Sequence, residues 1–506
     1  MKTISKFFLY LLSFLEGATV MVAELLGAKM LAPYFGASLY VWSSVLAITL
    51  GGLALGYFTG GILSHKKKSP DTLFYIMLIA AVFTILMPFL SKGVMSIASH
   101  FSLLPALLIS TITFLLPPVF LMGMISPLII GLLVNDISTS GRIAGSVYAV
   151  STVGGIIATF ITGFYIIPNY GLTIPCICAG ILLGILPFFM LIVQRKLVVL
   201  LFPVLSFFAA KQARVIVVES GIKVQYTSEG LLGQVMVADL PVYDSSGIVK
   251  DYLRYLYFNR IAQSVISVSD PAQSGFPYSK LIADQLSSLQ SGKDILVLGL
   301  GGGNLSNKLI EKGYHVDACE LDDRVVEVAK RFFFLSPQIN CSVDDARHYI
   351  RNASKKYDVI IFDVFKGEEN PNHVFTKESI EETMHLLNDK GLIIVNGNGY
   401  WQNEEGRGMR SIYKTLVNQG FHVTVIPTTI KPEERNLVFI ASRDGEIENV
   451  KDALLVASND MNGVFVLEDE KPVLDILNLQ ANKAWREGYI KYSTIPFSRS
   501  KVPLFN

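Results

Sequence analysis

The stretch "ILVLGLGGGNLSNKLIEKGYHVDACELDD" (residues 295–323) decides the fold of the C-terminal half. Its first apolar run predicts a buried strand, which is followed by a glycine turn, a helix and a second strand that ends in acidic residues. This order opens many units that bind a nucleotide or a nucleoside. The glycines allow a sharp turn and let a ligand approach the backbone closely.

Strands and helices continue to alternate after this stretch. The expected strands are "INCSVDD" (339–345), "YDVIIFDVF" (357–365), "GLIIVNGN" (391–398), "FHVTVIP" (421–427) and "NLVFIAS" (436–442). Alternation at this spacing predicts a parallel, doubly wound sheet, so we expect an α/β Rossmann-like domain of the methyltransferase type. In such sheets ligands bind outside the carboxyl ends of the strands.

The residues at those strand ends are the candidate site. They are Gly299, Gly301, Gly302, Gly303 and Asn304 in the turn, followed by Glu320, Asp345, Ala346 and Asp363 after the next three strands. Glu320 is placed to accept hydrogen bonds from ribose hydroxyls, and Asp345 to reach an exocyclic amine. Asp363 is placed to face a reacting group. A nicotinamide dinucleotide is the rival ligand, but it would favour glycine at position 304, so the pattern favours an adenosyl compound.

A small β domain is expected before this sheet, over residues 213–275. Its expected strands are "VIVV" (215–218), "IKVQYT" (222–227), "GQVMVADL" (233–240) and "YLYFN" (255–259). Short alternating strands that are punctuated by Gly, Ser and Asp predict β-hairpins. The helix-like stretch "PYSKLIADQLSSL" (277–289) follows, and the Rossmann-like domain is expected over 276–506.

The N-terminal half, residues 1–212, is expected to be a transmembrane helical domain. A spanning helix needs about 20 apolar residues, and the candidate runs are 7–31, 39–63, 72–95, 102–134, 143–167 and 172–193. Pro117 and Pro118 interrupt the fourth run, which is either one kinked helix or two short ones. The run 197–210 is short for a span, and an interfacial or re-entrant segment is preferred for it.

The charge distribution predicts the orientation of these helices. Residues 1–214 contain 12 Lys and Arg against 4 Asp and Glu, whereas the rest of the chain contains 31 against 38. Basic clusters favour the cytoplasmic side, and six spans with the N-terminus inside place all of them there. We therefore expect a multi-pass protein of the cell membrane with a cytoplasmic soluble part. Its acidic balance suits a cationic substrate and disfavours nucleic acid.

Two carboxylates lie within the first expected span, Glu16 and Glu24. An ionisable residue inside a membrane is costly and by default indicates a functional site; the alternative is a structural pair with Lys29 or with backbone groups. The spacing of the four cysteines indicates neither a zinc site nor a disulfide framework, so no metal is expected.

The soluble half resembles the spermidine synthase (polyamine aminopropyltransferase) family. The order "GGGN…CELDD…DDARHYI…YDVIIFDVF…HVFTKES" carries the resemblance, together with "GQVMVAD", which contains Gln234, and "YLYFNRIAQS", which contains Gln263. The apolar half resembles the membrane region of the fused transporter/spermidine-synthase-like branch in "ELLGAKMLAPYFGASLYVW" and "GSVYAVSTVGGIIATFITGFYIIPNYG". The late segment "VLEDEKPVLD" is similar to a terminal motif of that branch.

This resemblance implies an enzyme that transfers an aminopropyl group from decarboxylated S-adenosylmethionine to an amine such as putrescine. It implies that Gln234, the turn glycines, Glu320, Asp345 and Ala346 bind this co-substrate. It further implies that Asp363 is the catalytic base, and that Gln263 and Tyr278 contact the amine. No metal is implied, and a homodimer is left open.

The sequence departs from the family pattern at three places. The second acid of the family's Asp-x-x-Asp motif is replaced, because the segment reads Asp363-Val364-Phe365-Lys366. Tyr278-Ser279-Lys280 stands for the family's Tyr-His-Glu, and Asn304 for an Asp. A lysine would repel a polyamine, although Glu368 and Glu369 are available to replace the charge. The acceptor amine thus stays open, as do two other functions: a methyltransferase that uses S-adenosylmethionine at the membrane, and a transporter or sensor with a non-catalytic adenosyl-binding domain.

Overall fold

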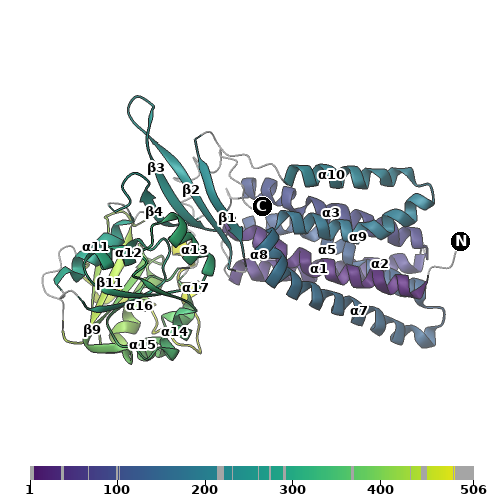
Figure 1. The fold of residues 1–506 in the computed structure, drawn as a ribbon. Helices are drawn as coiled ribbons and strands as arrows, with labels where there is room; N and C mark the ends of the chain where they lie inside the picture. The colour runs from purple at the N-terminus through teal and green to yellow at the C-terminus, as the bar shows by residue number, and fades with distance from the viewer. Residues whose placement is uncertain are drawn as a thin grey trace. The chain divides into compact units, whose positions relative to one another are not determined.

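The computed structural model describes residues 5–35, 39–66, 68–98, 101, 103–213, 221–230, 232–259, 261–272, 275–288, 292–365, 370–432, 435–445, 453–482 and 484. The chain forms two compact units. One contains the helices of the N-terminal half together with residues 228–234, and the other contains the remaining described residues. Figure 1 shows the helices of the first unit and the sheets of the second.

The helical unit consists of long apolar helices, as the sequence predicts. They are α1 (Lys6–Phe35), α2 (Leu39–Lys66), α3 (Pro70–Ala98), α4 (Leu103–Phe114), α5 (Leu116–Gly123), α6 (Ile125–Leu133), α7 (Ser140–Ile161), the π-helical turn η2 (Thr162–Ile166), α8 (Ile167–Tyr170), α9 (Thr173–Val193) and α10 (Leu201–Ala213). Within the described residues, six stretches are long and apolar enough to cross a membrane. They correspond to the six spans expected from the sequence.

The fourth apolar run is the one that breaks. It forms α4, which is too short to span, and then α5 and α6, which together give the candidate span Leu116–Leu133. The prolines lie in the first turn of α5, where a missing backbone N–H costs nothing. The short run after residue 196 forms a 3₁₀ turn (Leu197–Leu200) and α10, and is likewise shorter than a span.

The small β domain is an antiparallel sheet in the order β1-β2-β3-β4, built from β1 (Lys223–Glu229), β2 (Gln234–Tyr243), β3 (Val249–Phe258) and β4 (Ile261–Ser267). The expected strand 215–218 lies outside the described residues. The sequence did not predict β4, because Gln263, Ser264 and Ser267 weaken its apolar alternation.

The large sheet has the order β10-β11-β9-β8-β5-β6-β7. Its strands are β5 (Asp294–Leu298), β6 (His315–Glu320), β7 (Asn340–Val343), β8 (Tyr357–Phe362), β9 (Leu387–Asn398), β10 (His422–Pro427) and β11 (Asn436–Ser442). Strands β9, β8, β5, β6 and β7 pair in parallel, whereas β11 pairs antiparallel with both its neighbours. The expected Rossmann-like parallel sheet is confirmed for these five strands, and β11 makes the whole sheet mixed. The link from β10 to β11 is too short for the crossover that a parallel pair needs.

Helices cover both faces of this sheet. They are α11 (Pro277–Gln285), α12 (Asn304–Glu311) and α13 (Asp323–Phe332) against one face, and α14 (Ala346–Asn352), α15 (Lys377–Met384), α16 (Arg407–Asn418) and α17 (Leu474–Leu477) against the other. Alternate residues of β5 point to opposite faces of the sheet. Ile295 and Val297 lie in the core under α11, α12 and α13, whereas Leu296 and Leu298 lie in the core under α14, α15 and α16. A sheet buried on both faces explains why its strands read as continuous apolar runs.

Candidate active site

The glycine turn after β5 adopts a backbone that other residues rarely take. Gly299, Gly301 and Gly303 have φ values of +91°, +52° and +79°. A Cβ on Gly299 would lie 2.1 Å from the carbonyl oxygen of Asp363. Glycine is therefore required at position 299 both by its conformation and by the close approach of the end of β8. This contact fixes the turn against the residue that the sequence assigns to catalysis.

Two hydrogen-bonding groups hold the turn from the outside. The N–H of Gly302 donates to Oγ of Ser264 in β4 at 2.7 Å, which joins the small β domain to the turn. The carboxylate of Glu320, at the end of β6, accepts from the N–H of Leu300 at 3.0 Å and from the N–H of Asp322 at 3.0 Å. Burial raises the pKa of Glu320. Each of its oxygens keeps a further lone pair that can accept a hydrogen bond from a ligand hydroxyl.

Asp363 follows β8 and lies between two neutral donors. Oδ2 accepts from the hydroxyl of Tyr278 on α11 at 3.0 Å, and Oδ1 accepts from Nδ2 of Asn396 on β9 at 2.7 Å. Burial raises the pKa of Asp363 to about 6, although both hydrogen bonds act to lower it. Burial and the Asp363 charge raise the pKa of Tyr278 well above its usual value, so the phenol stays protonated and donates. A carboxyl in this setting can exchange a proton near neutral pH.

Asp345 has a different setting, at the start of α14. Its Oδ1 caps the helix by accepting from the N–H groups of Arg347 at 3.0 Å and His348 at 3.1 Å. Its Oδ2 lies 2.9 Å from Nε2 of His373. The hydrogen bond from His373 is the main cause that lowers the pKa of Asp345, so the group stays ionised. Ala346 is buried as the first residue of α14.

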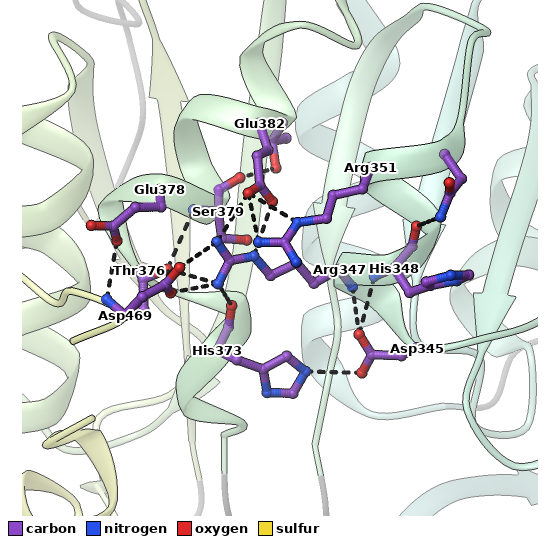
Figure 2. A network of polar contacts seen from close by, with 12 residues as sticks. Asp345, Arg347, His348, Arg351, His373, Thr376, Glu378, Ser379, Glu382 and Asp469 are labelled. Atoms are coloured by element: carbon purple, nitrogen blue, oxygen red, sulfur yellow. Dashed lines mark hydrogen bonds and ion pairs between the residues drawn. The ribbon is translucent and has the colours of Figure 1, made fainter. Parts of the chain in front are cut away.

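A buried arginine, Arg347, links α14 to neighbouring segments through a network of polar contacts, as Figure 2 shows. The guanidinium of Arg347 makes paired hydrogen bonds to Glu382 at 2.9 and 3.0 Å and to Asp469 at 2.5 and 2.7 Å. It also donates to the carbonyl oxygen of His373 at 3.0 Å, and the hydroxyl of Thr376 donates to Asp469 at 2.8 Å. One cation thus ties together the helix that carries Asp345 and the turn that carries His373.

Asp469 belongs to the C-terminal strap, which we define as residues 464–477. The strap is bound by backbone contacts: the N–H of Lys377 donates to the carbonyl oxygen of Leu467 at 2.8 Å, and the N–H of Leu474 donates to Oδ1 of Asn372 at 2.7 Å. Leu467, Leu474 and Leu477 are buried in the core under α16. The "VLEDEKPVLD" motif is therefore a structural part of this region of the domain.

The remaining predicted residues have other surroundings. The backbone of Gln263 lies beside the turn, with its carbonyl oxygen 3.8 Å from where a Cβ on Gly301 would be. Gln234 is buried, and its Nε2 donates to Oε1 of Glu229 at 2.6 Å. Nδ2 of Asn304 donates to the carbonyl oxygen of Val265 at 3.2 Å. The departures at Lys366, and the acids Glu368 and Glu369, lie outside the described residues.

The sequence did not single out Asn396, Ser264 or His373. Asn396 had a signal in the sequence, because polar residues near the carboxyl end of a buried strand indicate a site. In the structure its Oδ1 is buried without a hydrogen-bond partner in the described part of the chain. Ser264 and His373 lie within the quoted segments "YLYFNRIAQS" and "HVFTKES", but their contacts join segments that are far apart in the sequence, so the sequence did not predict them.

Comparisons with known proteins show what the chain is similar to. Residues 275–451 match the sequence model of the spermine/spermidine synthase domain. A polyamine aminopropyltransferase of Vibrio vulnificus is 34% identical over 152 residues, which are 28% of this chain and 51% of that protein. An N-terminal histidine N-methyltransferase of Emericella nidulans is 30% identical over 191 residues, 35% of this chain and 34% of that protein.

A solved structure of a probable spermidine synthase from Corynebacterium glutamicum is 22% identical, covering 48% of this chain and 87% of its own, with a TM-score of 0.37. The α/β part of this chain is thus similar to the spermine/spermidine synthase domain over residues 275–451. The chain spans about half the length of the Vibrio aminopropyltransferase that it matches.

Proposed function

We propose that the protein is a membrane-anchored, aminopropyltransferase-like enzyme that transfers a group from an S-adenosylmethionine-type donor to an amine. The observation that carries the proposal is the placement of Asp363. Its carboxyl lies at the sheet edge, its backbone touches the glycine turn, and two neutral donors orient it.

The donor would bind along the carboxyl edge of β5, β6 and β7. The turn glycines would lie against its tail, Glu320 would hold the ribose hydroxyls, and Asp345 with Ala346 would meet the adenine. The ionised state of Asp345 suits it to accept a hydrogen bond from an exocyclic amine. Gln234 is proposed as a further donor contact.

Asp363 would act as the general base. An amine attacks only when it is neutral, so its nitrogen lone pair must be freed of a proton. That lone pair forms a bond to the carbon next to the sulfonium, and the carbon–sulfur electron pair leaves to the sulfur, giving a neutral thioether. The proton that the new ammonium loses passes to Asp363, whose pKa of about 6 suits it to receive and later release a proton near neutral pH.

The acceptor would lie against Asp363, Tyr278 and Gln263. A polyamine is the acceptor that the family suggests, but Lys366 in place of an acid disfavours a second positive charge near that position. A less highly charged amine, or one that is delivered from the bilayer, fits the sequence better. The basic loops between the apolar helices support a cytoplasmic position for the α/β domain in a cell membrane.

Product analysis tests the proposal. The purified full-length protein is incubated with decarboxylated S-adenosylmethionine, or with S-adenosylmethionine, and a panel of amines, and the adenosyl product is identified by mass spectrometry. Methylthioadenosine from the decarboxylated donor supports aminopropyl transfer. A protein that binds neither donor by calorimetry contradicts the proposal.

A methyltransferase is the second candidate, and the resemblance to the Emericella N-methyltransferase favours it. The same sheet edge would hold S-adenosylmethionine, and Asp363 would still receive the proton of the attacking amine. Release of S-adenosylhomocysteine instead of methylthioadenosine in the same assay would select this function.

A further inference from the structure

The helical unit buries a carboxyl group of its own, which the proposed transferase does not use. Glu16 on α1 is 2% exposed. Its Oε2 accepts from Oγ of Ser151 on α7 at 2.9 Å and from Oγ of Ser126 on α6 at 3.3 Å. In the described part of the chain Glu16 forms no ion pair, and the structural pairing with Lys29 is excluded because 13 residues of helix, roughly 20 Å, separate them. Neutral hydroxyls alone hold this carboxyl.

Close helix packing places these hydroxyls. A Cβ on Gly17 would lie 2.0 Å from the carbonyl oxygen of Ser151, and a Cβ on Gly154 would lie 2.3 Å from the carbonyl oxygen of Phe14. The backbones of α1 and α7 therefore touch, which small residues permit between membrane helices. Glu16 is adjacent to this contact, so its side chain meets Ser151 directly.

The break in the fourth apolar run supplies the second hydroxyl. Helix α6 begins at Ile125, with one residue between it and the end of α5, and Ser126 lies in its first turn. The N-terminus of a helix carries a partial positive charge that stabilises a nearby anion. The ionised carboxyl thus has hydrogen bonds and a favourable dipole, whereas the apolar bundle favours the neutral form. In the described residues no opposite charge pairs with Glu16 to favour its ionised form over its protonated form.

Titratable neighbours of Glu16 lie on α2 and α7. Tyr57 and Tyr148 interact with it electrostatically, and their rings meet edge to face at 5.8 Å. Tyr57 and Tyr148 each keep more than a third of their surface exposed. No charge from the other described helices packed on α1 acts on Glu16. Helices α4, α5 and α6 carry no titratable residue, and Asp71, Tyr75 and Lys92 of α3 and Cys176 and Cys178 of α9 do not act on it.

We propose that Glu16 is a proton-binding site of the helical unit, and that its protonation is linked to the contacts of α1 with α6 and α7. When ionised, the carboxylate accepts from both serines. When a proton adds to Oε2, this oxygen becomes a donor, and the serine that accepts from it must turn its own proton to another acceptor. Proton uptake thus changes a hydrogen bond between helices.

Infrared difference spectroscopy of the full-length protein in lipid vesicles tests this site directly. The carbonyl stretch of a protonated carboxyl is followed as the pH is lowered, in the wild type, in Glu16→Gln and in Glu24→Gln. Glu24 is the matched control, because it is a second carboxyl on α1, two turns further on. We expect a titrating band that Glu16→Gln removes and Glu24→Gln keeps.

Two further variants keep the proposal testable if Glu16→Gln does not fold. Ser151→Ala and Ser126→Ala each remove a donor to the ionised carboxyl, so each should move the titration midpoint to higher pH, by up to about one unit. Wild-type spectra without a band that depends on Glu16 would overturn the proposal. Unchanged midpoints in both serine variants would also overturn it, because protonation would then not be linked to α6 and α7. Neither result depends on the transferase activity.

Discussion

Asp363 and Asp345 lie at the same edge of one sheet, yet their surroundings differ in kind. Asp363 has two neutral donors and a pKa raised by burial to about 6, whereas Asp345 has a histidine and two helix N–H groups and a lowered pKa. Environments that separate two carboxyl pKa values also separate their roles. One acid can exchange a proton near neutral pH, and the other stays an ionised hydrogen-bond acceptor.

The largest effect is expected from Asp363→Asn. If Asp363 is the base, turnover should fall about 10²- to 10⁴-fold while donor binding persists. Adenosyl product release and donor calorimetry measure the two quantities. Asp389→Asn, an exposed carboxylate on β9, is the control and should keep full turnover. Comparable activity in the two variants would remove the distinction between Asp363 and Asp345.

Removing the ion pairs of Arg347, which hold α14, should lower the free energy of unfolding. Arg347→Met leaves Glu382 and Asp469 without their shared buried cation, so the free energy of unfolding should fall by about 3–5 kcal/mol. Thermal unfolding of the full-length protein in detergent follows this loss.

Arg351→Met is the matched control for that prediction. Its side chain is 54% exposed and binds the same Glu382, so it should cost at most about 1 kcal/mol. Equal costs for the two arginines would mean that the network in Figure 2 does not support α14.

The raised pKa of Asp363 predicts a pH-dependent gain in stability for Asp363→Asn. Folding favours the protonated acid, so the contribution of Asp363 to stability is full below its unfolded pKa near 4 and is lost as the pH rises to about 6. At pH 7 and above, the free energy of unfolding of Asp363→Asn should exceed that of the wild type by about 2 kcal/mol, a figure that allows for the partial exposure of the side chain. This difference should vanish near pH 4. A difference that does not change with pH would show that Asp363 is ionised normally.

Asp345→Asn should weaken donor binding without slowing the chemical step. Asparagine still caps α14, but the charge that we propose to receive the adenine amine is lost, so donor affinity should fall about tenfold. Calorimetry measures the affinity, and saturating donor should restore the wild-type kcat. Asp344→Asn, beside it, should keep the affinity; a lowered kcat at saturation would give Asp345 a role in the chemistry.

Tyr278→Phe is expected to give the smallest effect. The hydrogen bond from Tyr278 lowers the pKa of Asp363, so its removal should move the acidic limb of the kcat profile upward by less than about one pH unit. A downward shift would contradict the assigned donor.

The sequence predicted the parts of the site that follow from local order. Glu320, Asp345 and Asp363 lie at or just after the carboxyl ends of three strands, and parallel strands bring such ends together. It did not predict that Asn396 and Asp469 contact this region, because these pairings join residues 33 and 122 positions apart. The sequence did not predict the antiparallel direction of β11, because an apolar pattern does not show the direction of a strand. It left open whether the fourth apolar run is one kinked helix or two short ones, because such a pattern does not locate a break.

The C-terminal strap also imposes an order on the synthesis of the protein. Ribosomes deliver the helical unit first and the strands of the large sheet next, while the residues that hold Arg347 and cover α16 come last. Until Asp469 has left the ribosome, α14 lacks one of its two anionic partners. The strands of the large sheet are thus complete before the support of α14 is finished, and a chain truncated ahead of the strap would carry the sheet with that support incomplete.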